Sequence, residues 1–247
     1  MNEGNVYDCV LKHPARILII GPSFAGKTTL ISNILDNHSQ IFNDKFDRII
    51  YCSDGSELVL YDKSIFVEIY KYLDKSIIDS LDKKMKNCII IDDFMHRAAN
   101  DIEISELFTK RSHHRNTTII LLLQNLFPKS KYMTDIKRNA TYIFLMSNPS
   151  DENSIRVFSQ QFDPQNPQFL YSAFIDATKN KPFSYLLVDM HQQQAKELRV
   201  RSNLGIYGRA DIFVYIKIQE YIELCKRIGL IGKNKKSSVT KTIDYSF

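Results

Sequence analysis

The residues best suited to chemistry lie in a short loop near the start of the chain, residues 21–29. Gly21, Gly26, Lys27 and Thr28 occupy the fixed places of the phosphate-binding pattern G-x-x-x-x-G-K-[ST]. Glycines permit backbone angles that a Cβ would forbid, so consecutive N–H groups can turn inward around an anion. The lysine can reach the β- and γ-phosphates, and the threonine hydroxyl can bind a magnesium ion. The loop therefore predicts a site for a nucleoside triphosphate.

Two regular elements must hold this loop in place. The apolar run at residues 17–20 predicts a short buried strand, and residues 27–39 predict a helix that begins near Lys27. The free N–H groups and the positive dipole end of such a helix would point at the same anion. The alternative is an ordinary strand–turn–helix corner, but the surrounding strand and helix favour the phosphate loop.

A second polar cluster follows the apolar run at residues 88–91. Asp92 and Asp93 come at the end of this predicted strand, some sixty residues after the loop. Asp92 would hold magnesium directly or through water, because this hard cation prefers oxygen ligands. Asp93 could polarise an attacking water as a general base. The simpler alternative is a strand that ends in two surface aspartates.

A third polar position is Gln124, which follows the apolar run at residues 117–123. A polar amide at the carboxyl end of a central strand faces the nucleotide crevice of an open α/β sheet. There it can orient the attacking water and sense the γ-phosphate. Alternatively, Gln124 only caps the end of the strand.

The order of predicted elements indicates the fold class. Strands are expected at residues 17–20, 46–52, near 66, 88–91, 117–123, 141–146 and 184–189, and helices at 27–39, 75–84, 103–111, 152–161 and 167–180. Alternation of strands and helices predicts an α/β fold with a mostly parallel sheet flanked by helices. We expect a domain over residues 1–198 and a basic C-terminal extension over 199–247. An edge strand near residue 200, a helix or strand–helix unit over 212–228 and a disordered end of about fifteen residues complete the prediction.

Charge is unevenly distributed along the 247 residues. Residues 199–247 hold ten lysines and arginines against four acids, a net charge of +6, whereas the whole chain has +5. This distribution favours a polyanionic partner, although a solvated lysine-rich tail would look the same. No apolar run is long enough to span a membrane, and the polar N-terminus is not typical of a signal peptide. Four scattered cysteines indicate a reduced intracellular setting and argue against a metal cluster.

Taken together, these motifs resemble the DNA-packaging ATPases of the FtsK–HerA superfamily. The nearer match is the poxvirus-type branch found in large DNA viruses, virophages and Polinton/Maverick-like elements. The resemblance covers roughly residues 10–205 and rests on GPSFAGKTTL (21–30), IIIDDFM (89–95), HHRNTTIILLLQNLF (113–127), RNATYIFLMSNPSD (138–151), and YLLVD (185–189) followed by LRVRSN (198–203). The last three segments are the most specific, because other phosphate-loop families lack them. One departure is Asp93, where the wider superfamily often has glutamate.

The resemblance implies a RecA-like phosphate-loop (P-loop) NTPase core that uses ATP and Mg²⁺ in a homo-oligomeric ring, a pentamer or hexamer. Such a ring drives double-stranded DNA into a preformed capsid, with a capsid or membrane protein as partner at the packaging vertex. It would work inside the infected host, in association with assembling virions. The residues expected to bind phosphates are Gly21, Pro22, Ser23, Phe24, Ala25, Gly26, Lys27, Thr28 and Thr29.

The resemblance also implies residues for magnesium binding, water activation, γ-phosphate sensing and an arginine finger. Thr28 and Asp92 would serve magnesium, Asp93 would activate water and Gln124 would be the sensor. An arginine finger acting on a neighbour's nucleotide is also expected, and Arg115 is the first candidate because it lies at the end of its predicted strand remote from its own nucleotide. A surface or salt-bridged role for this arginine is the alternative. Reserve candidates for the finger are Arg138, Arg199 and Arg201.

Two other functions share the phosphate loop. A nucleotide or small-molecule kinase would need an arginine-rich lid over a second substrate, and the sequence shows no such segment. A nucleotide-binding virion assembly factor without motor activity is the other alternative. Stimulation of ATP hydrolysis by double-stranded DNA would distinguish a packaging motor from a kinase and from an assembly factor.

Overall fold

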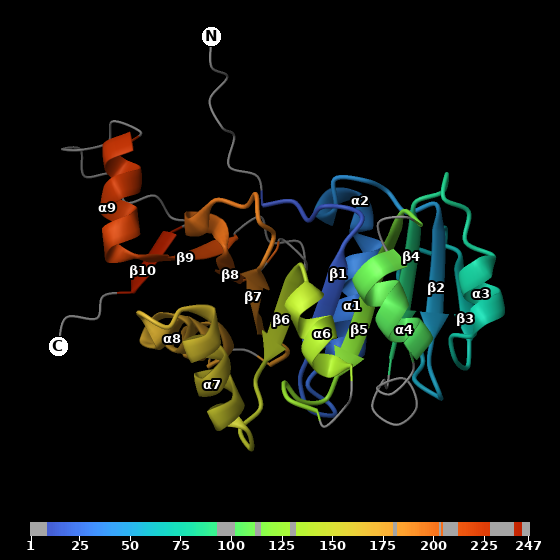
Figure 1. Ribbon diagram of the computed structural model, residues 1–247, viewed down its shortest axis with the longest axis horizontal. Helices are drawn as coiled ribbons and strands as arrows, with labels where there is room; N and C mark the ends of the chain where they lie inside the picture. Colours follow the sequence, from blue (N-terminus) through green and yellow to red (C-terminus); the bar gives the residue numbers. More distant parts are fainter. Residues whose placement is uncertain are drawn as a thin grey trace, which may run out of the picture.

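One sheet runs through the part of the chain that the computed structural model describes, residues 9–92, 102–111, 115–128, 132–179, 182–202, 204, 212–227 and 240–243. Its strands are β1 (Arg16–Ile20), β2 (Arg48–Cys52), β3 (Val67–Tyr70), β4 (Asn87–Ile91), β5 (Thr117–Leu123), β6 (Tyr142–Met146), β7 (Tyr185–Asp189), β8 (Val200–Ser202), β9 (Phe213–Lys217) and β10 (Thr240–Ile243). They lie in the order β10-β9-β8-β7-β6-β1-β5-β4-β2-β3 (Figure 1).

Most of this sheet is parallel. Every neighbouring pair from β3 through β2, β4, β5 and β1 to β6 is parallel. The pairs β6–β7, β7–β8 and β8–β9 are antiparallel, and β10 returns to a parallel pairing with β9. The carboxyl ends of the six parallel strands therefore lie along one edge of the sheet. The predicted α/β class with a mostly parallel sheet is confirmed.

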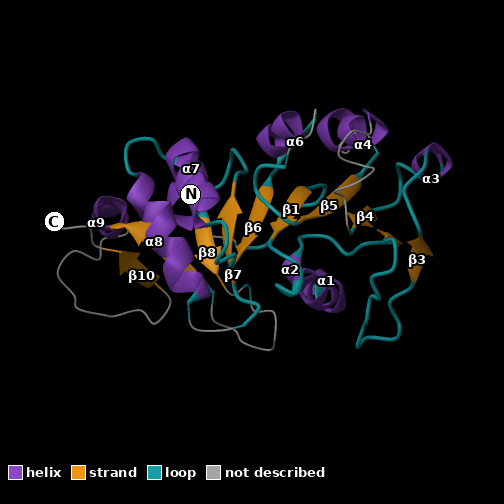
Figure 2. Ribbon diagram, turned by 90° about the horizontal axis from the view of Figure 1, so that it is seen from below, coloured by secondary structure: helices purple, strands orange, loops and turns teal. Residues whose placement is uncertain are grey.

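Helices cover both faces of the sheet. They are α1 (Lys27–Asp36), α2 (His38–Ile41), α3 (Lys75–Asp79), α4 (Ile102–Glu106), α6 (Met133–Asn139), α7 (Glu152–Phe162), α8 (Pro167–Thr178) and α9 (Ile218–Arg227). A π-helical turn, Leu107–Arg111, continues α4, and a 3₁₀ turn, Lys196–Leu198, precedes β8. Seen along the sheet, α1 and α2 lie on one face, and α3, α4 and α6 lie on the other (Figure 2).

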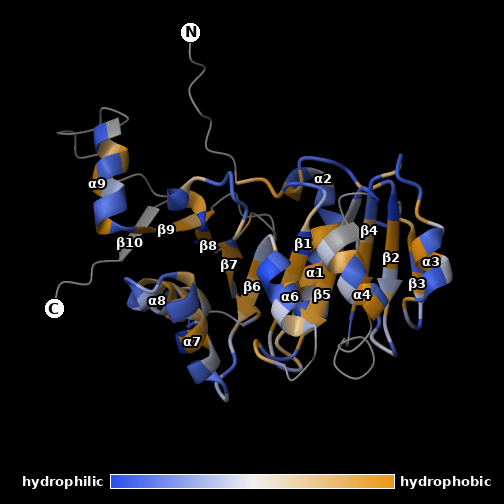
Figure 3. Cartoon of the chain, in the orientation of Figure 1, coloured by the Kyte–Doolittle hydropathy of each residue, from blue (hydrophilic) through white to orange (hydrophobic). Residues whose placement is uncertain are grey.

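The core follows from the alternation of side chains along the central strands. In β1, Leu18 and Ile20 belong to the apolar cluster on the α3, α4 and α6 side, whereas Ile17 and Ile19 belong to the cluster on the α1 side. Both faces are buried, so the central strands are mostly apolar, as their colours show (Figure 3). This double burial makes β1 a firm support for the loop that follows it.

Several predicted boundaries differ from the observed ones. The helix predicted over residues 27–39 ends at Asp36, and the short α2 follows. The helix predicted over 75–84 is the five-residue α3, whose N-cap Asp74 accepts a hydrogen bond from the N–H of Ile77. The strand predicted near residue 200 is β8, but it pairs with β7 and β9 and so lies inside the sheet.

The C-terminal residues continue the sheet. Strands β8, β9 and β10 extend it beyond β7, so the boundary predicted at residue 198 is not a break in the architecture. The predicted disorder of the last fifteen or so residues is wrong for Thr240–Ile243, which form β10. The sequence analysis missed this strand because its residues, Thr-Lys-Thr-Ile, are too few and too polar to give a clear apolar pattern.

All four cysteines are free thiols. Cys52 and Cys88 are buried in β2 and β4, and burial raises the pKa of Cys52 to about 12, with a smaller contribution from Asp74. They pack as small apolar residues. Among the described helices, none is both long and apolar enough to cross a membrane.

Candidate active site

The phosphate loop connects β1 to α1, and two of its positions require glycine for different reasons. Gly26 has a φ of +92°, in the left-handed region that side chains disfavour, and a Cβ there would lie 2.4 Å from Cδ1 of Phe183. The φ of Gly21 is not in that region, but a Cβ there would lie 2.8 Å from Cβ of Met146 on β6. The expected unusual backbone angle is therefore confirmed for Gly26, whereas Gly21 is needed for close packing.

The N-terminus of α1 is built to face an anion. The helix begins at Lys27, as predicted, and Gly26 is its N-cap. Gly26 has no side chain to accept from the first N–H groups of the helix, and its first turn contains no acidic residue. These N–H groups and the positive end of the helix dipole consequently remain suited to a phosphate group.

Lys27 lies folded over the loop that precedes it. Its Nζ donates hydrogen bonds to the carbonyl oxygens of Gly21 and Pro22, each at 2.8 Å. Two of the partners of the ammonium are therefore neutral carbonyl oxygens of the loop. An anionic oxygen in this position would be a stronger acceptor than a carbonyl, because charge-assisted hydrogen bonds are about twice as strong as neutral ones.

Asp92 follows β4 and meets Thr28 across the loop. The Thr28 hydroxyl donates to Oδ2 of Asp92 at 3.2 Å, and the carboxylate is almost fully buried. The backbone N–H of Asp92 donates to the carbonyl oxygen of Cys52 at 2.9 Å, which fixes the end of the strand. The structure thus brings together the two side chains predicted to serve magnesium. No cluster of three or more His, Cys, Asp or Glu side chains suited to a metal occurs in the described residues.

Tyr51 is a partner of this carboxylate that the sequence analysis missed. Its hydroxyl donates to Oδ2 of Asp92 at 2.7 Å from the neighbouring strand β2. Burial raises the pKa of Tyr51 well above its usual range, and the hydrogen bond and charge of Asp92 add to the shift. The phenol is therefore a permanent donor. The available signal was a hydroxyl-bearing residue among the apolar residues Ile49, Ile50 and Cys52 of this strand.

Gln124 follows β5, which lies between β1 and β4. Its side chain is exposed and lines the same cavity as Lys27 and Asp92. The topology therefore places Gln124 between the strand that precedes the phosphate loop and the strand that precedes Asp92. Its role as sensor remains a prediction.

The cavity that joins these groups has a volume of about 530 Å³. Of the predicted site residues, it is lined by Ser23, Phe24, Gly26, Lys27, Thr28, Thr29, Asp92 and Gln124, together with Ser56, Leu122 and Phe183. Gly21, Pro22 and Ala25 belong to the loop but do not line this cavity. Ser56 and Phe183 were not predicted, because they come from loops whose position depends on the fold rather than on local sequence.

Asp93 and Arg115 were also predicted to have catalytic roles. Asp93, the expected general base, lies outside the described residues. Arg115 lies at the start of β5, at the opposite edge of the sheet from the cavity, as expected. Its guanidinium donates to the carbonyl oxygen of Ile78 and, at 3.1 Å, to Asp79 at the end of α3. Within the subunit, Arg115 is therefore a salt-bridged arginine, which was the alternative to a role as arginine finger.

The reserve arginines differ in accessibility. Arg201 is wrong as a finger candidate, because it is fully buried and bonded to Asp189 at 2.7 Å. Arg199 is half-buried and donates to the carbonyl oxygen of His191 at 3.3 Å. Arg138 is exposed in the last turn of α6. Only Arg138 presents a largely exposed side chain.

The sheet order, the loop between β1 and α1, and the acid after β4 together define the class: the chain has the fold of the P-loop NTPases, with a RecA-like core. It is similar to the genome packaging NTPase B204 from Sulfolobus turreted icosahedral virus 2, solved with sulfate, at a TM-score of 0.51 and 16% identity over 76% of this chain and 95% of that one. The DNA-packaging ATPase B204 from Sulfolobus turreted icosahedral virus aligns at a TM-score of 0.47 and 17% identity, over 76% and 96% of the two chains. No protein-family model and no curated protein sequence matches the chain.

Proposed function

We propose that this protein is an ATPase that drives double-stranded DNA into a preformed capsid. The observation that supports the chemistry is the single cavity that gathers Lys27, Thr28, Asp92 and Gln124 around the phosphate loop. These are the groups that phosphoryl transfer needs for charge neutralisation, metal binding and water positioning. The fold similarity to a genome packaging NTPase agrees with an NTPase role.

The donor set fits Mg²⁺. Thr28 and Asp92 offer one hydroxyl and one carboxylate oxygen within hydrogen-bonding distance of each other. Mg²⁺ usually binds one or two carboxylates and completes its shell with water and phosphate oxygens. When bound, the ion would neutralise charge on the β- and γ-phosphates.

The protein's own groups then divide the work of hydrolysis. Lys27 would exchange the carbonyl oxygens of Gly21 and Pro22 for phosphate oxygens. Asp93 would take a proton from the attacking water, and Gln124 would orient that water. Arg115 of a neighbouring subunit would stabilise charge on the γ-phosphate after release from its own Asp79.

The motor function rests on the sequence resemblance and on charge. Motifs at 113–127, 138–151 and 185–203 resemble the poxvirus-type packaging ATPases, and residues 199–247 carry a net charge of +6. A packaging motor must grip any sequence, so contacts with DNA phosphates suit it. Its partners would be copies of itself in a ring of five or six and a capsid or membrane protein at the packaging vertex, inside the infected host.

Hydrolysis with and without double-stranded DNA tests this proposal. The parent protein should hydrolyse ATP faster when DNA is added. Lys27→Ala should lose binding or turnover, and Asp93→Asn should bind ATP with Mg²⁺ but scarcely hydrolyse it, since an amide cannot accept the proton. DNA-independent hydrolysis would favour an assembly factor, and phosphate transfer to a nucleotide would favour a kinase.

A further inference from the structure

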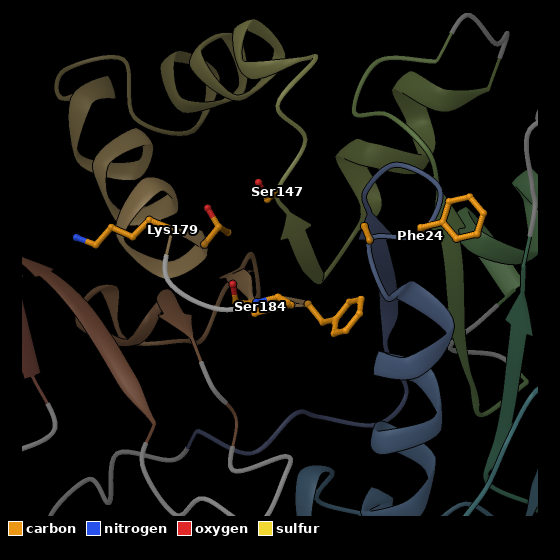
Figure 4. A pocket seen from close by; sticks show the side chains of 8 residues that line it. Phe24, Ser147, Lys179 and Ser184 are labelled. Atoms are coloured by element: carbon orange, nitrogen blue, oxygen red, sulfur yellow. The ribbon is translucent and has the colours of Figure 1, made fainter.

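A second cavity lies on the other side of the phosphate loop. Its volume is about 470 Å³, and it is lined by Phe24, Ala25, Ser147, Thr178, Lys179, Pro182, Phe183 and Ser184. Figure 4 shows the cavity between the loop, which carries Phe24, and the wall that carries Ser147, Lys179 and Ser184. Phe24 and Phe183 also line the phosphate cavity, so the two cavities adjoin at these residues.

Sheet topology fixes which end of a nucleotide would lie in this cavity. The groups suited to the γ-phosphate and metal, Asp92 and Gln124, follow β4 and β5 on one side of β1. Ser147 follows β6 on the other side of β1, and Tyr185, which comes after Ser184, pairs with Met146 at the end of β6. A triphosphate with its γ-end near Asp92 must therefore leave the loop toward β6 and β7. The second cavity lies in that direction.

Phe183 stands at the passage between the cavities. Its ring packs against Gly26, because a Cβ on that glycine would come within 2.4 Å of Cδ1 of Phe183. The residue has a φ of +61°, a backbone conformation that phenylalanine rarely adopts, yet half of its surface remains exposed. A strained backbone that presents an aromatic face beside an anion site is typical of a ligand contact rather than of core packing.

Four polar residues, Ser147, Thr178, Lys179 and Ser184, line the rest of the cavity together with Ala25 and Pro182. Ser147 is exposed, and the hydroxyl of Thr178 donates to the carbonyl oxygen of Phe174. Lys179 is paired with Asp176 at 2.9 Å. A cavity of this size with one aromatic wall and a few polar groups suits a nucleoside. Phe24 is a poorer candidate for the aromatic contact, because it is 99% exposed and its ring points away from Ser147 and Ser184 (Figure 4).

We propose that the second cavity holds the ribose and base of the bound nucleotide, with the base stacked on Phe183. This inference rests on the proposed ATPase function and adds the base contact to it. Stacking needs only a π-face, so Phe183 would contribute to binding any nucleotide, and the polar rim would decide among bases.

Binding of Mg²⁺-ADP and Mg²⁺-pyrophosphate to the full chain, measured by calorimetry, tests the proposal. Pyrophosphate occupies the phosphate loop but has no base. Phe183→Leu, which keeps an apolar side chain over Gly26, should bind ADP roughly 5- to 100-fold more weakly and pyrophosphate as well as the parent does. Phe183→Tyr should bind both as the parent does. Phe66→Leu, at a distant phenylalanine that is also exposed, should change neither.

Each other outcome overturns the stacking contact in a different way. Equal losses for ADP and pyrophosphate would mean that Phe183 only supports the loop. Tighter binding of both by Phe183→Leu would mean that the ring obstructs the site. If Phe183→Leu bound ADP as the parent does, the base would not stack on Phe183. If the parent protein bound neither ligand, the proposed ATPase function itself would fail, and this inference with it.

Discussion

The carboxylate of Asp92 connects the phosphate loop to the neighbouring strands of the sheet. It accepts hydrogen bonds from Thr28, on the phosphate loop side, and from Tyr51, on the neighbouring strand. Thr28 would exchange this bond for a metal ligand, whereas Tyr51 would keep its bond and hold the carboxylate in place. Because the pKa of Tyr51 is raised, the phenol stays protonated below its ordinary value near 10. Its hydrogen bond would be lost only as pH rises through the raised value, so it adds no pH dependence near neutrality.

Tyr51→Phe tests Tyr51 as a positioning residue. The variant keeps the ring in the core but removes the hydroxyl that orients Asp92. We expect the Mg²⁺ concentration for half-maximal hydrolysis to rise roughly 10-fold, since loss of a partner behind a metal ligand costs about 10- to 100-fold in metal affinity or activity. Titration of the rate with Mg²⁺ measures the change.

Tyr215→Phe is the matched control. Tyr215 is also a buried tyrosine that donates to a carboxylate, Asp176 at 3.0 Å, but it lies on β9, away from the phosphate cavity. Its variant should keep the parent's Mg²⁺ dependence. A shift of equal size in both variants would attribute the effect of Tyr51 to general destabilisation.

At the scale of elements, the corner between β1 and α1 depends on Gly26. An alanine there would adopt a left-handed conformation, at about 1–2 kcal/mol, and its Cβ would also collide with Phe183. A substitution of Gly55 separates the conformational cost from the collision. Gly55 also has a positive φ, +114°, but nothing lies within 4 Å of its Cβ position. Gly55→Ala should therefore lower the free energy of unfolding by the conformational cost alone, and Gly26→Ala by more.

The double variant Gly26→Ala with Phe183→Ala completes this comparison. Without the ring, the alanine at position 26 should meet no obstacle. Adding Gly26→Ala to Phe183→Ala should therefore lower the free energy of unfolding by the conformational cost alone. Urea unfolding of the four proteins measures these differences. Additive losses in the double variant would show that the two residues do not collide.

Arg115 connects β5 to α3 and is also the first candidate for the arginine finger. Its exposed ion pair with Asp79 stabilises the fold by no more than about 1 kcal/mol. We therefore expect Arg115→Ala to fold, bind ATP and lose turnover by about 10³-fold or more, as loss of an arginine finger does. Asp79→Ala breaks the same ion pair but keeps the guanidinium, and should retain most turnover.

Mixing subunits shows where Arg115 acts. Arg115→Ala has an intact phosphate loop, and Lys27→Ala has an intact arginine, so mixed interfaces would contain one complete site. Hydrolysis should reappear on mixing. Failure of rescue despite demonstrated co-assembly would exclude Arg115 and direct attention to Arg138, which is exposed, before the half-buried Arg199.

The elements that sequence predicts best are those with a strong local pattern. β5 was predicted residue for residue, because seven apolar or β-branched residues in a row have few alternatives. The positions of the phosphate loop, Asp92 and Gln124 at the carboxyl ends of β1, β4 and β5 could be predicted because each follows an apolar run in the sequence. Tyr51 and Phe183 were not, since each acts through a contact with a residue far away in sequence, and such contacts exist only once the sheet has formed.

In the molecule as a whole, strands β8, β9 and β10 of the basic C-terminal region belong to the sheet. Because Thr240–Ile243 pair with β9, truncation before this strand would remove structure together with charge. Replacement of Lys233, Lys235 and Lys236 by glutamine removes three positive charges without truncating the chain. DNA affinity should fall about equally on all sequences, and the slope of log affinity against log salt should lessen by up to about 3. An unchanged slope would place the DNA contacts elsewhere.

Displacement of a third strand is the direct test of our proposal that ATP hydrolysis moves this protein along double-stranded DNA. A short oligonucleotide bound as a triplex at one end of a duplex is released when a motor runs into it, and its release can be followed by fluorescence. The parent protein should release it only with ATP and Mg²⁺, at a delay that grows with duplex length, and Lys27→Ala should not. Release without ATP, or hydrolysis stimulated by DNA with no release at any length, would contradict translocation along DNA.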